Sequence, residues 1–179
     1  MQVMFKSCLQ MRMFCLFLCL LIFMAGSTVI AQEEDFPENH REARLLMAAE
    51  QGDTATARLL IRSGINVNAA TYEGVTALMY AAENGHTEMV LILLQNGADP
   101  DRKPDNGQTA LIASIRSGYI ETAETLIRNG ADVNLPDNDK VTPLLHAIAV
   151  DSFYMADMLL YYDASVDAAD GQGTNALML

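Results

Sequence analysis

Cysteine is scarce in this chain of 179 residues, and all three copies, Cys8, Cys15 and Cys19, lie within the first 20 residues. The remaining chain therefore cannot form a disulfide, and it offers no thiol as a nucleophile or as a metal ligand. Histidine is equally scarce, with only three residues in the whole chain. A fold built from this sequence must be stabilised by packing alone, and cysteine catalysis is excluded beyond residue 19.

Basic residues are also few. Eleven lysines and arginines stand against 23 aspartates and glutamates, for a formal net charge of −12. Such a surface repels phosphate groups, so nucleic acids and anionic membrane lipids are poor candidates for partners. A basic protein would be attracted to it. Acidity that serves solubility alone explains the same composition, and both explanations stay open.

A long hydrophobic run occupies residues 13–25, after the basic residues Lys6 and Arg12 and before small residues that end at Ala31. This order predicts a secretory signal peptide, residues 1–31, cleaved after Ala31, which makes the protein periplasmic or secreted. Removing Lys6 and Arg12 leaves nine basic and 23 acidic residues, so the mature charge is −14. An uncleaved membrane anchor over residues 13–31 is the alternative, because its length approaches the ~20 residues that a membrane span requires.

Residues 32–40 follow the predicted cleavage site. They carry four acidic side chains and Pro37, with no periodic apolar residues. A segment of this composition cannot bury enough apolar surface to fold by itself. We interpret it as an acidic linker to the folded part of the chain, which is expected to begin at residue 41.

Beyond residue 40 the sequence repeats with a period of 33 residues. The segment 76–86, Thr-Ala-Leu-Met-Tyr-Ala-Ala-Glu-Asn-Gly-His, recurs at 109–119 and, with more changes, at 142–152. A repeat of this length indicates stacked units, which present a long surface and seldom form a catalytic pocket. Aligned by this spacing, the copies are residues 41–70, 71–103, 104–136 and 137–169, with a partial copy at 170–179.

Each unit is predicted to contain two helices. In the second copy, the Thr76 hydroxyl can cap the first helix, a contribution of ~1 kcal/mol, and Gly85 supplies the left-handed residue that ends it. A second helix is expected from about Thr87 to Gln95, with large apolar residues on the side that faces the neighbouring units. Alanines between the two helices would let them approach closely.

Several motifs at matching positions resemble those of ankyrin repeats. They are Thr-Pro-Leu at 142–144, Ala-Ala-Glu-Asn-Gly-His at 81–86, and Asn-Gly-Ala-Asp at 96–99 and 129–132. The resemblance covers residues 41–179 and implies an all-α fold, a solenoid of helix-turn-helix units with projecting β-turn fingers. It also implies a monomeric, non-enzymatic scaffold that binds a protein partner on the concave face formed by the fingers and first helices.

The copies depart from the family pattern at both ends. Copy one has Ala43-Arg-Leu where Thr-Pro-Leu is typical, so we expect an N-terminal capping unit. Copy four has Asp151 and Asp163 in place of helix-ending glycines, and aspartate tolerates the left-handed conformation at some cost in stability. Copy five ends at Leu179, inside its first helix. It either docks on copy four as a stub or is a piece of a longer array, and we favour the longer array.

The polar residues of the repeats show no arrangement typical of catalysis or metal binding. His86 stands where ankyrin repeats use histidine for hydrogen bonding in a turn, and His146 has no second histidine at helical spacing. His40 lies in the acidic linker. The three aspartates within residues 132–139 crowd one finger, but Lys140 replaces the glycine that a calcium loop needs. We therefore predict no catalytic residue, no metal and no cofactor.

The resemblance places the partner-contacting residues at finger tips and at the ends of first helices. Tyr72 is the expected anchor, because an exposed aromatic gives a large contact area at a small entropic cost. The alternative is that Tyr72 packs on the adjacent finger. The expected contact residues are Tyr72, Glu73, Val75, Glu83, Asn84, Asp105, Asn106, Gln108, Arg116, Ser117, Asn138, Asp139 and Val141, together with Ala149 and Val150.

These features predict an exported ankyrin-repeat scaffold that holds one protein partner in the periplasm or outside the cell. The alternative is a structural module, or a fragment, of a longer envelope protein or secreted effector. A hydrolase that uses carboxylates without a recognisable motif is the third hypothesis.

Overall fold

The computed structural model describes residues 38–178. This part of the chain contains eight α-helices and no β-strand, apart from one isolated antiparallel bridge between Ala70 and Thr76. The predicted signal peptide, the alternative anchor and residues 32–37 of the linker lie outside the described residues. The helices are α2 (Glu38–Gln51), α3 (Thr54–Arg62), α4 (Ala77–Glu83), α5 (Thr87–Gln95), α6 (Ala110–Arg116), α7 (Ile120–Arg128), α8 (Pro143–Ala149) and α9 (Phe153–Tyr161).

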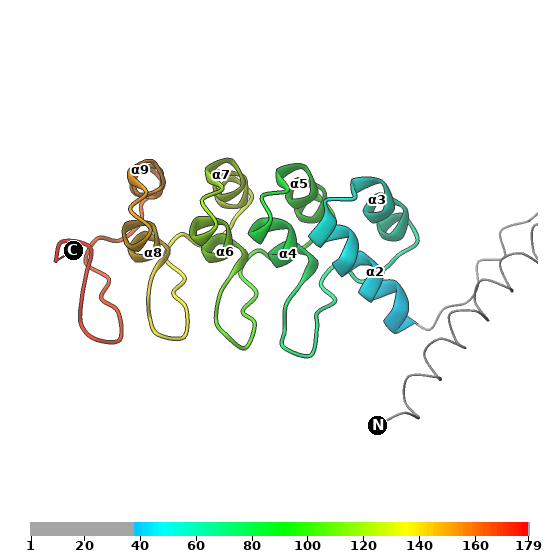
Figure 1. The fold of residues 1–179 in the computed structure, drawn as a ribbon, viewed down its shortest axis with the longest axis horizontal. Helices are drawn as coiled ribbons and strands as arrows, with labels where there is room; N and C mark the ends of the chain where they lie inside the picture. Colours follow the sequence, from blue (N-terminus) through cyan, green and yellow to red (C-terminus); the bar gives the residue numbers. More distant parts are fainter. Residues whose placement is uncertain (1–37, 179) are drawn as a thin grey trace, which may run out of the picture. The chain divides into compact units, whose positions relative to one another are not determined.

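The helices pair within each copy and stack between copies (Figure 1). The first helices α2, α4, α6 and α8 form one row, and the second helices α3, α5, α7 and α9 form another row against it. The loops that join successive copies project from the first row as fingers, on the side away from the second row. Each finger takes the number of the copy whose first helix follows it. The predicted all-α stack of helix pairs with fingers is therefore confirmed for the described residues.

Threonine caps begin the first helices of the inner copies. The Thr76 hydroxyl accepts a hydrogen bond from the Met79 N–H at 3.4 Å, and Thr109 and Thr142 cap α6 and α8 in the same way. A cap of this kind satisfies an N–H group that the helix leaves without a partner. The predicted start of α4 and the predicted bounds of α5 are both confirmed.

One apolar core runs without interruption from Leu45 in α2 to Ala164 after α9. Ala81 and Ala82 of α4 are completely buried, and so is Leu93 of α5. Burial of a side chain the size of leucine contributes ~2 kcal/mol, and each copy obtains part of this burial from its neighbours. The stability of every copy therefore depends on the copies beside it.

Polar side chains in the loops add a row of hydrogen bonds between copies. In each case a side-chain oxygen of one copy accepts from a backbone N–H about 31 residues further along the chain. The three bonds, each 2.8 Å long, run from Asp99 N–H to Asn68 Oδ1, from Asp132 N–H to Asp101 Oδ1 and from Ser165 N–H to Asn134 Oδ1. Their constant spacing fixes the register of the stack.

Left-handed residues end the helices in all four copies. Gly85 has a φ of +69°, and the ring of Tyr119 from the next copy lies directly against the position that its Cβ would occupy. In copy four the left-handed positions belong to Asp151 and Asp163, with φ values of 53° and 64°. The turns are therefore retained without glycine, as predicted, at a backbone cost that glycine would avoid.

The first copy differs from the expected boundary. Helix α2 begins at Glu38, three residues before the predicted start of the folded part, and its 14 residues make it twice as long as the seven-residue α4. The interpretation of residues 38–40 as linker is therefore wrong. Acidic residues near a helix N-terminus interact favourably with the helix dipole, which supports a helix that starts in this acidic segment.

The partial copy docks on copy four. The Gly171 N–H donates to the Asp139 carbonyl at 2.9 Å, and Ala176 packs against the core. Residues 170–178 form turns without a helix, as expected for a segment too short to hold one alone. Within residues 38–178, no helix has the length and apolar character needed to cross a membrane.

The glycine turns generate a stability prediction. Gly97 has a φ of +85° with no atom near its Cβ position, whereas a Cβ on Gly85 would overlap the Tyr119 ring. We expect Gly97→Ala to lower the free energy of unfolding by about 1 kcal/mol, from backbone strain alone. Gly85→Ala adds a steric overlap, so we expect a loss of about 3 kcal/mol. Urea unfolding followed by circular dichroism measures both, and equal losses would contradict the role given to Tyr119.

Candidate functional site

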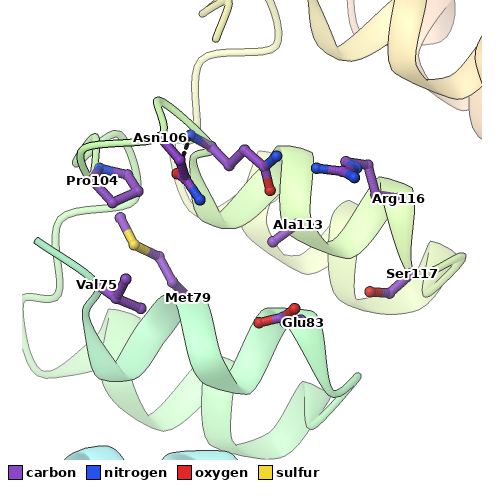
Figure 2. Close-up of a pocket in the computed structure, with 9 residues that line it drawn as sticks. Val75, Met79, Glu83, Pro104, Asn106, Ala113, Arg116 and Ser117 are labelled. Atoms are coloured by element: carbon purple, nitrogen blue, oxygen red, sulfur yellow. Dashed lines mark hydrogen bonds between the residues drawn. The ribbon is translucent and has the colours of Figure 1, made fainter. Parts of the chain in front are cut away.

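A groove opens on the finger side of the stack, between copies two and three (Figure 2). Its volume is about 280 Å³. The walls come from the first helices α4 and α6, and the outer edge comes from the fingers that precede them. The residues that line it are Val75, Met79, Glu83, Pro104, Asn106, Gln108, Ala113, Arg116 and Ser117.

One end of the groove is apolar. Val75, at the base of a finger, is half-buried and lies beside Met79 of α4, whose thioether extends towards Pro104 (Figure 2). Met79 and Pro104 are themselves buried, so packing holds their side chains in place as the floor of the groove. This end of the groove can therefore receive an apolar side chain.

The other end carries two opposite charges. Glu83 at the end of α4 and Arg116 at the end of α6 are both exposed, with Ser117 beside them. Among the described residues, neither Glu83 nor Arg116 forms a side-chain hydrogen bond or an ion pair. Both charges remain available to a ligand, one on each wall of the groove.

A turn in the third finger fixes the positions of the polar residues Asn106 and Gln108 at the outer edge of the groove. The Asn106 Oδ1 accepts from the Gln108 N–H at 3.0 Å, the contact drawn in Figure 2. Such an Asx turn is local, so it fixes the finger without help from a partner. The Asp105 N–H also donates to the Glu73 carbonyl at 2.9 Å, which ties the third finger to the second. The groove is thus preformed.

The groove exists at this junction because copy three has a small residue there. Ala113 stands at the repeat position that Tyr80 occupies in copy two and His146 occupies in copy four. Both larger side chains are partly buried, and Tyr80 packs against the core. Alanine leaves that space open between α4 and α6.

The structure brings together six of the residues predicted from sequence. Val75, Glu83, Asn106, Gln108, Arg116 and Ser117 all line the groove. Asn138, Asp139 and Val141 line a second hollow, of about 620 Å³, with Lys140 and residues 170–172 of the partial copy. The remaining predicted residues line neither hollow, although all are exposed; they are Tyr72, Glu73, Asn84, Asp105, Ala149 and Val150.

Three lining residues were missed from sequence: Met79, Pro104 and Ala113. Met79 and Pro104 stand at positions that contribute to the core or the finger base, where no partner contact was expected. The signal for Ala113 is present in the repeat alignment, as a small residue between two large ones. A search for missing volume, rather than for exposed polar residues, would have found it.

Tyr72 does not pack on the adjacent finger, so that alternative is wrong. Its side chain is 94 % exposed at the tip of the second finger. The neighbouring Glu73 raises the pKa of the Tyr72 phenol, first through a hydrogen bond and then through its negative charge. The raised pKa favours the neutral form of the Tyr72 phenol.

The two histidines of the repeats form structural contacts. His86 Nε2 lies 3.1 Å from the carbonyl oxygen of Glu50, near the end of α2 in the preceding copy, which agrees with the hydrogen-bonding role implied by the resemblance. His146 Nε2 lies 2.9 Å from Asp137 Oδ2, at the base of the fourth finger. No group of three or more potential metal ligands occurs among residues 38–178.

Comparison with known families gives one result. A family model described as "Ankyrin repeats (3 copies)" matches residues 17–104 and residues 101–170. The match covers most of the chain, so the protein belongs to the ankyrin-repeat family. Ankyrin repeats generally mediate protein–protein interaction, and the proteins built from them are typically non-enzymatic interaction modules. A comparison with curated proteins finds no relative of this chain.

The fourth finger provides a prediction about rigidity. Asp137 accepts from the N–H groups of Asp139 and Val141, both at 2.9 Å, in addition to its contact with His146. We expect Asp137→Ala to lower the free energy of unfolding by about 2 kcal/mol, because three hydrogen bonds to a charged group are lost together. Hydrogen exchange at the Asp139 and Val141 amides is expected to accelerate. Asp139→Ala is the control, and an equal effect from it would contradict the role of Asp137.

Proposed function

We propose that this protein is an exported, non-enzymatic scaffold that binds one protein partner through the groove between copies two and three. The single observation that carries the proposal is the preformed groove itself. It combines an apolar floor at Met79 and Pro104 with two exposed, unpaired charges at Glu83 and Arg116. Family membership supports a protein as the ligand.

The groove suits an extended segment of the partner. An apolar side chain would enter between Val75, Met79 and Pro104, and a basic and an acidic residue would meet Glu83 and Arg116 respectively. Opposite charges on one ligand give orientation and specificity more than affinity. The overall negative charge of the chain would attract a partner whose surface is basic around this segment. We include the exposed Tyr72 as a second contact, at the finger tip.

Two variants test the groove. Ala113→Tyr fills it with a residue that copy two already carries at the matching position, so the fold should tolerate it. Glu83→Lys combined with Arg116→Glu reverses both charges while the net charge stays the same. We expect either change to reduce the capture of the partner at least tenfold, about 1.4 kcal/mol. The tyrosine would occupy the space that the apolar side chain of the partner needs, and the reversed charges would repel the charged residues of the same segment. Affinity purification from the envelope fraction with quantitative mass spectrometry measures the capture.

The matched control lies on the second helices. Arg58 and Glu88 form an exposed ion pair at 3.4 Å, and Arg58→Glu with Glu88→Lys swaps it without changing net charge. This control is expected to retain the partner. A protein captured equally by wild type, control and both groove variants would show that the groove is not the binding site. Loss of capture on Tyr72→Ala alone would move the main contact to the finger tip.

The location of the protein is part of the same proposal. The basic start, the apolar run at 13–25 and the small residues before Ala31 support export with cleavage after Ala31. All three cysteines would be removed with this segment. The mature protein would then be indifferent to the redox state of its compartment.

Export leads to a further measurable outcome. We expect the mature protein to begin at Gln32, which N-terminal sequencing of the chain from fractionated cells would show. We also expect the melting temperature of the mature protein to be unchanged by a reducing agent, because no disulfide can form. A membrane-bound chain that still carries residues 13–31 would instead support the anchor.

A further inference from the structure

Helix α9, which belongs to the row of second helices away from the fingers (Figure 1), carries an exposed aromatic surface. Phe153 and Tyr154 of α9 are each 76 % exposed, and Tyr161 is 80 % exposed. Phe153 and Tyr154 meet edge to face with centroids 6.0 Å apart. Tyr154 and Tyr161 are seven residues apart, so they lie on one face of the helix, about 10 Å from each other along its axis. We call these three residues the α9 patch.

Helices α5 and α7 have charged or polar residues at the two tyrosine positions. Tyr154 corresponds to Glu121 in α7 and to Glu88 in α5, by the repeat spacing. Tyr161 corresponds to Arg128 in α7. All of these side chains are exposed in the stack. The aromatic residues of copy four thus replace a solvated surface rather than a core.

Stacking of a further copy would not cover the two tyrosines. Glu88 and Glu121 stay exposed although α5 and α7 each have a following copy beside them. Leu160 behaves differently, because its counterparts Leu94 and Ile127 are half-buried in the inner copies. Leu160 is therefore left out of the patch.

The surroundings of the patch are acidic. Asp151 lies just before α9, Asp157 lies within it and Asp163 lies just after it, and residues 141–178 contain no lysine or arginine. Asp157 lies within the patch, one turn from Tyr154 and Tyr161, and is exposed. The nearest cation on the neighbouring helix, Arg128, is already bound to Glu124 at 2.8 Å and to the Tyr162 hydroxyl at 3.0 Å.

We propose that the α9 patch is a second docking site, which binds a basic amphipathic helix of a protein partner. Apolar residues of that helix would pack against the aromatic rings, and flanking lysines or arginines would face the aspartates. A second copy of this chain would bring two acidic rims together, and an anionic membrane would be repelled in the same way. Charge therefore selects a basic partner.

The test uses two synthetic helical peptides of 18 residues labelled with fluorescein. One has leucines at positions i, i+3, i+4 and i+7 with lysines elsewhere, and the other has glutamates in place of the lysines. We expect the purified chain to bind the lysine peptide at least tenfold more tightly than the glutamate peptide by fluorescence anisotropy. The affinity is expected to fall as sodium chloride rises, because exposed charges are screened.

Tyr154→Glu combined with Tyr161→Arg is the matched variant. It installs the residues that α7 carries at the same positions and leaves the net charge unchanged. We expect it to lose at least tenfold in affinity for the lysine peptide while its melting temperature stays close to wild type. Tyr72→Ala, which removes an exposed tyrosine from a finger, and Ala113→Tyr, which fills the groove, are expected to bind as wild type does.

Three results would overturn the proposal. The first is equal binding of the lysine peptide by wild type and the double variant. The second is self-association of wild type, in analytical ultracentrifugation, that the double variant abolishes, which would assign the patch to a second copy. The third is flotation of wild type but not the variant with phosphatidylglycerol vesicles, which would assign it to a membrane. None of these results bears on the groove, whose own variants are separate.

Discussion

No copy in this stack can bury its own apolar surface, and the rest of the structure depends on that constraint. The core passes from Leu45 to Ala164 without a break, so each helix pair obtains its cover from the pairs beside it. The hydrogen bonds from backbone N–H groups of one loop to side-chain oxygens of the preceding loop fix the spacing between the copies. Because stacking keeps the first helices in one row, these helices and the fingers form a long surface that a partner can reach.

The same constraint locates both candidate surfaces. The groove lies at a junction, where a small residue at position 113 leaves unfilled a space that Tyr80 and His146 occupy elsewhere. The α9 patch lies on the outer side of a junction, where the repeat does not require apolar residues and yet three aromatics occur. The groove arises because a side chain is smaller than its counterparts in other copies, and the α9 patch arises because exposed positions carry aromatic side chains. Each is a departure from the residues that the neighbouring copies carry at the same repeat positions.

The sequence predicted the parts of the fold that depend on local chemistry. The Thr76 cap, the left-handed residues and the bounds of α5 follow from single residues and their near neighbours. The start of α2 at Glu38 did not, because an acidic segment without apolar periodicity gives only a weak helix signal. Most of the residues that line the groove were among the predicted contact residues, but its floor was not, since Met79 and Pro104 meet only when two copies stack. The exposure of Tyr154 likewise depends on which side of α9 packs inward.

The contact between a turn glycine and a ring from the next copy has a mechanical consequence. Gly52 meets the His86 ring and Gly85 meets the Tyr119 ring, but Gly118 has no atom within 4 Å of its Cβ position, because Ser152 stands where a ring would be. At this side of the stack, the junction between copies three and four relies on polar bonds such as that between Arg128 and Tyr162, for which water competes. Among the junctions between the four full copies, this one has the least apolar cover at its turns, so under load it would open before the two junctions that precede it.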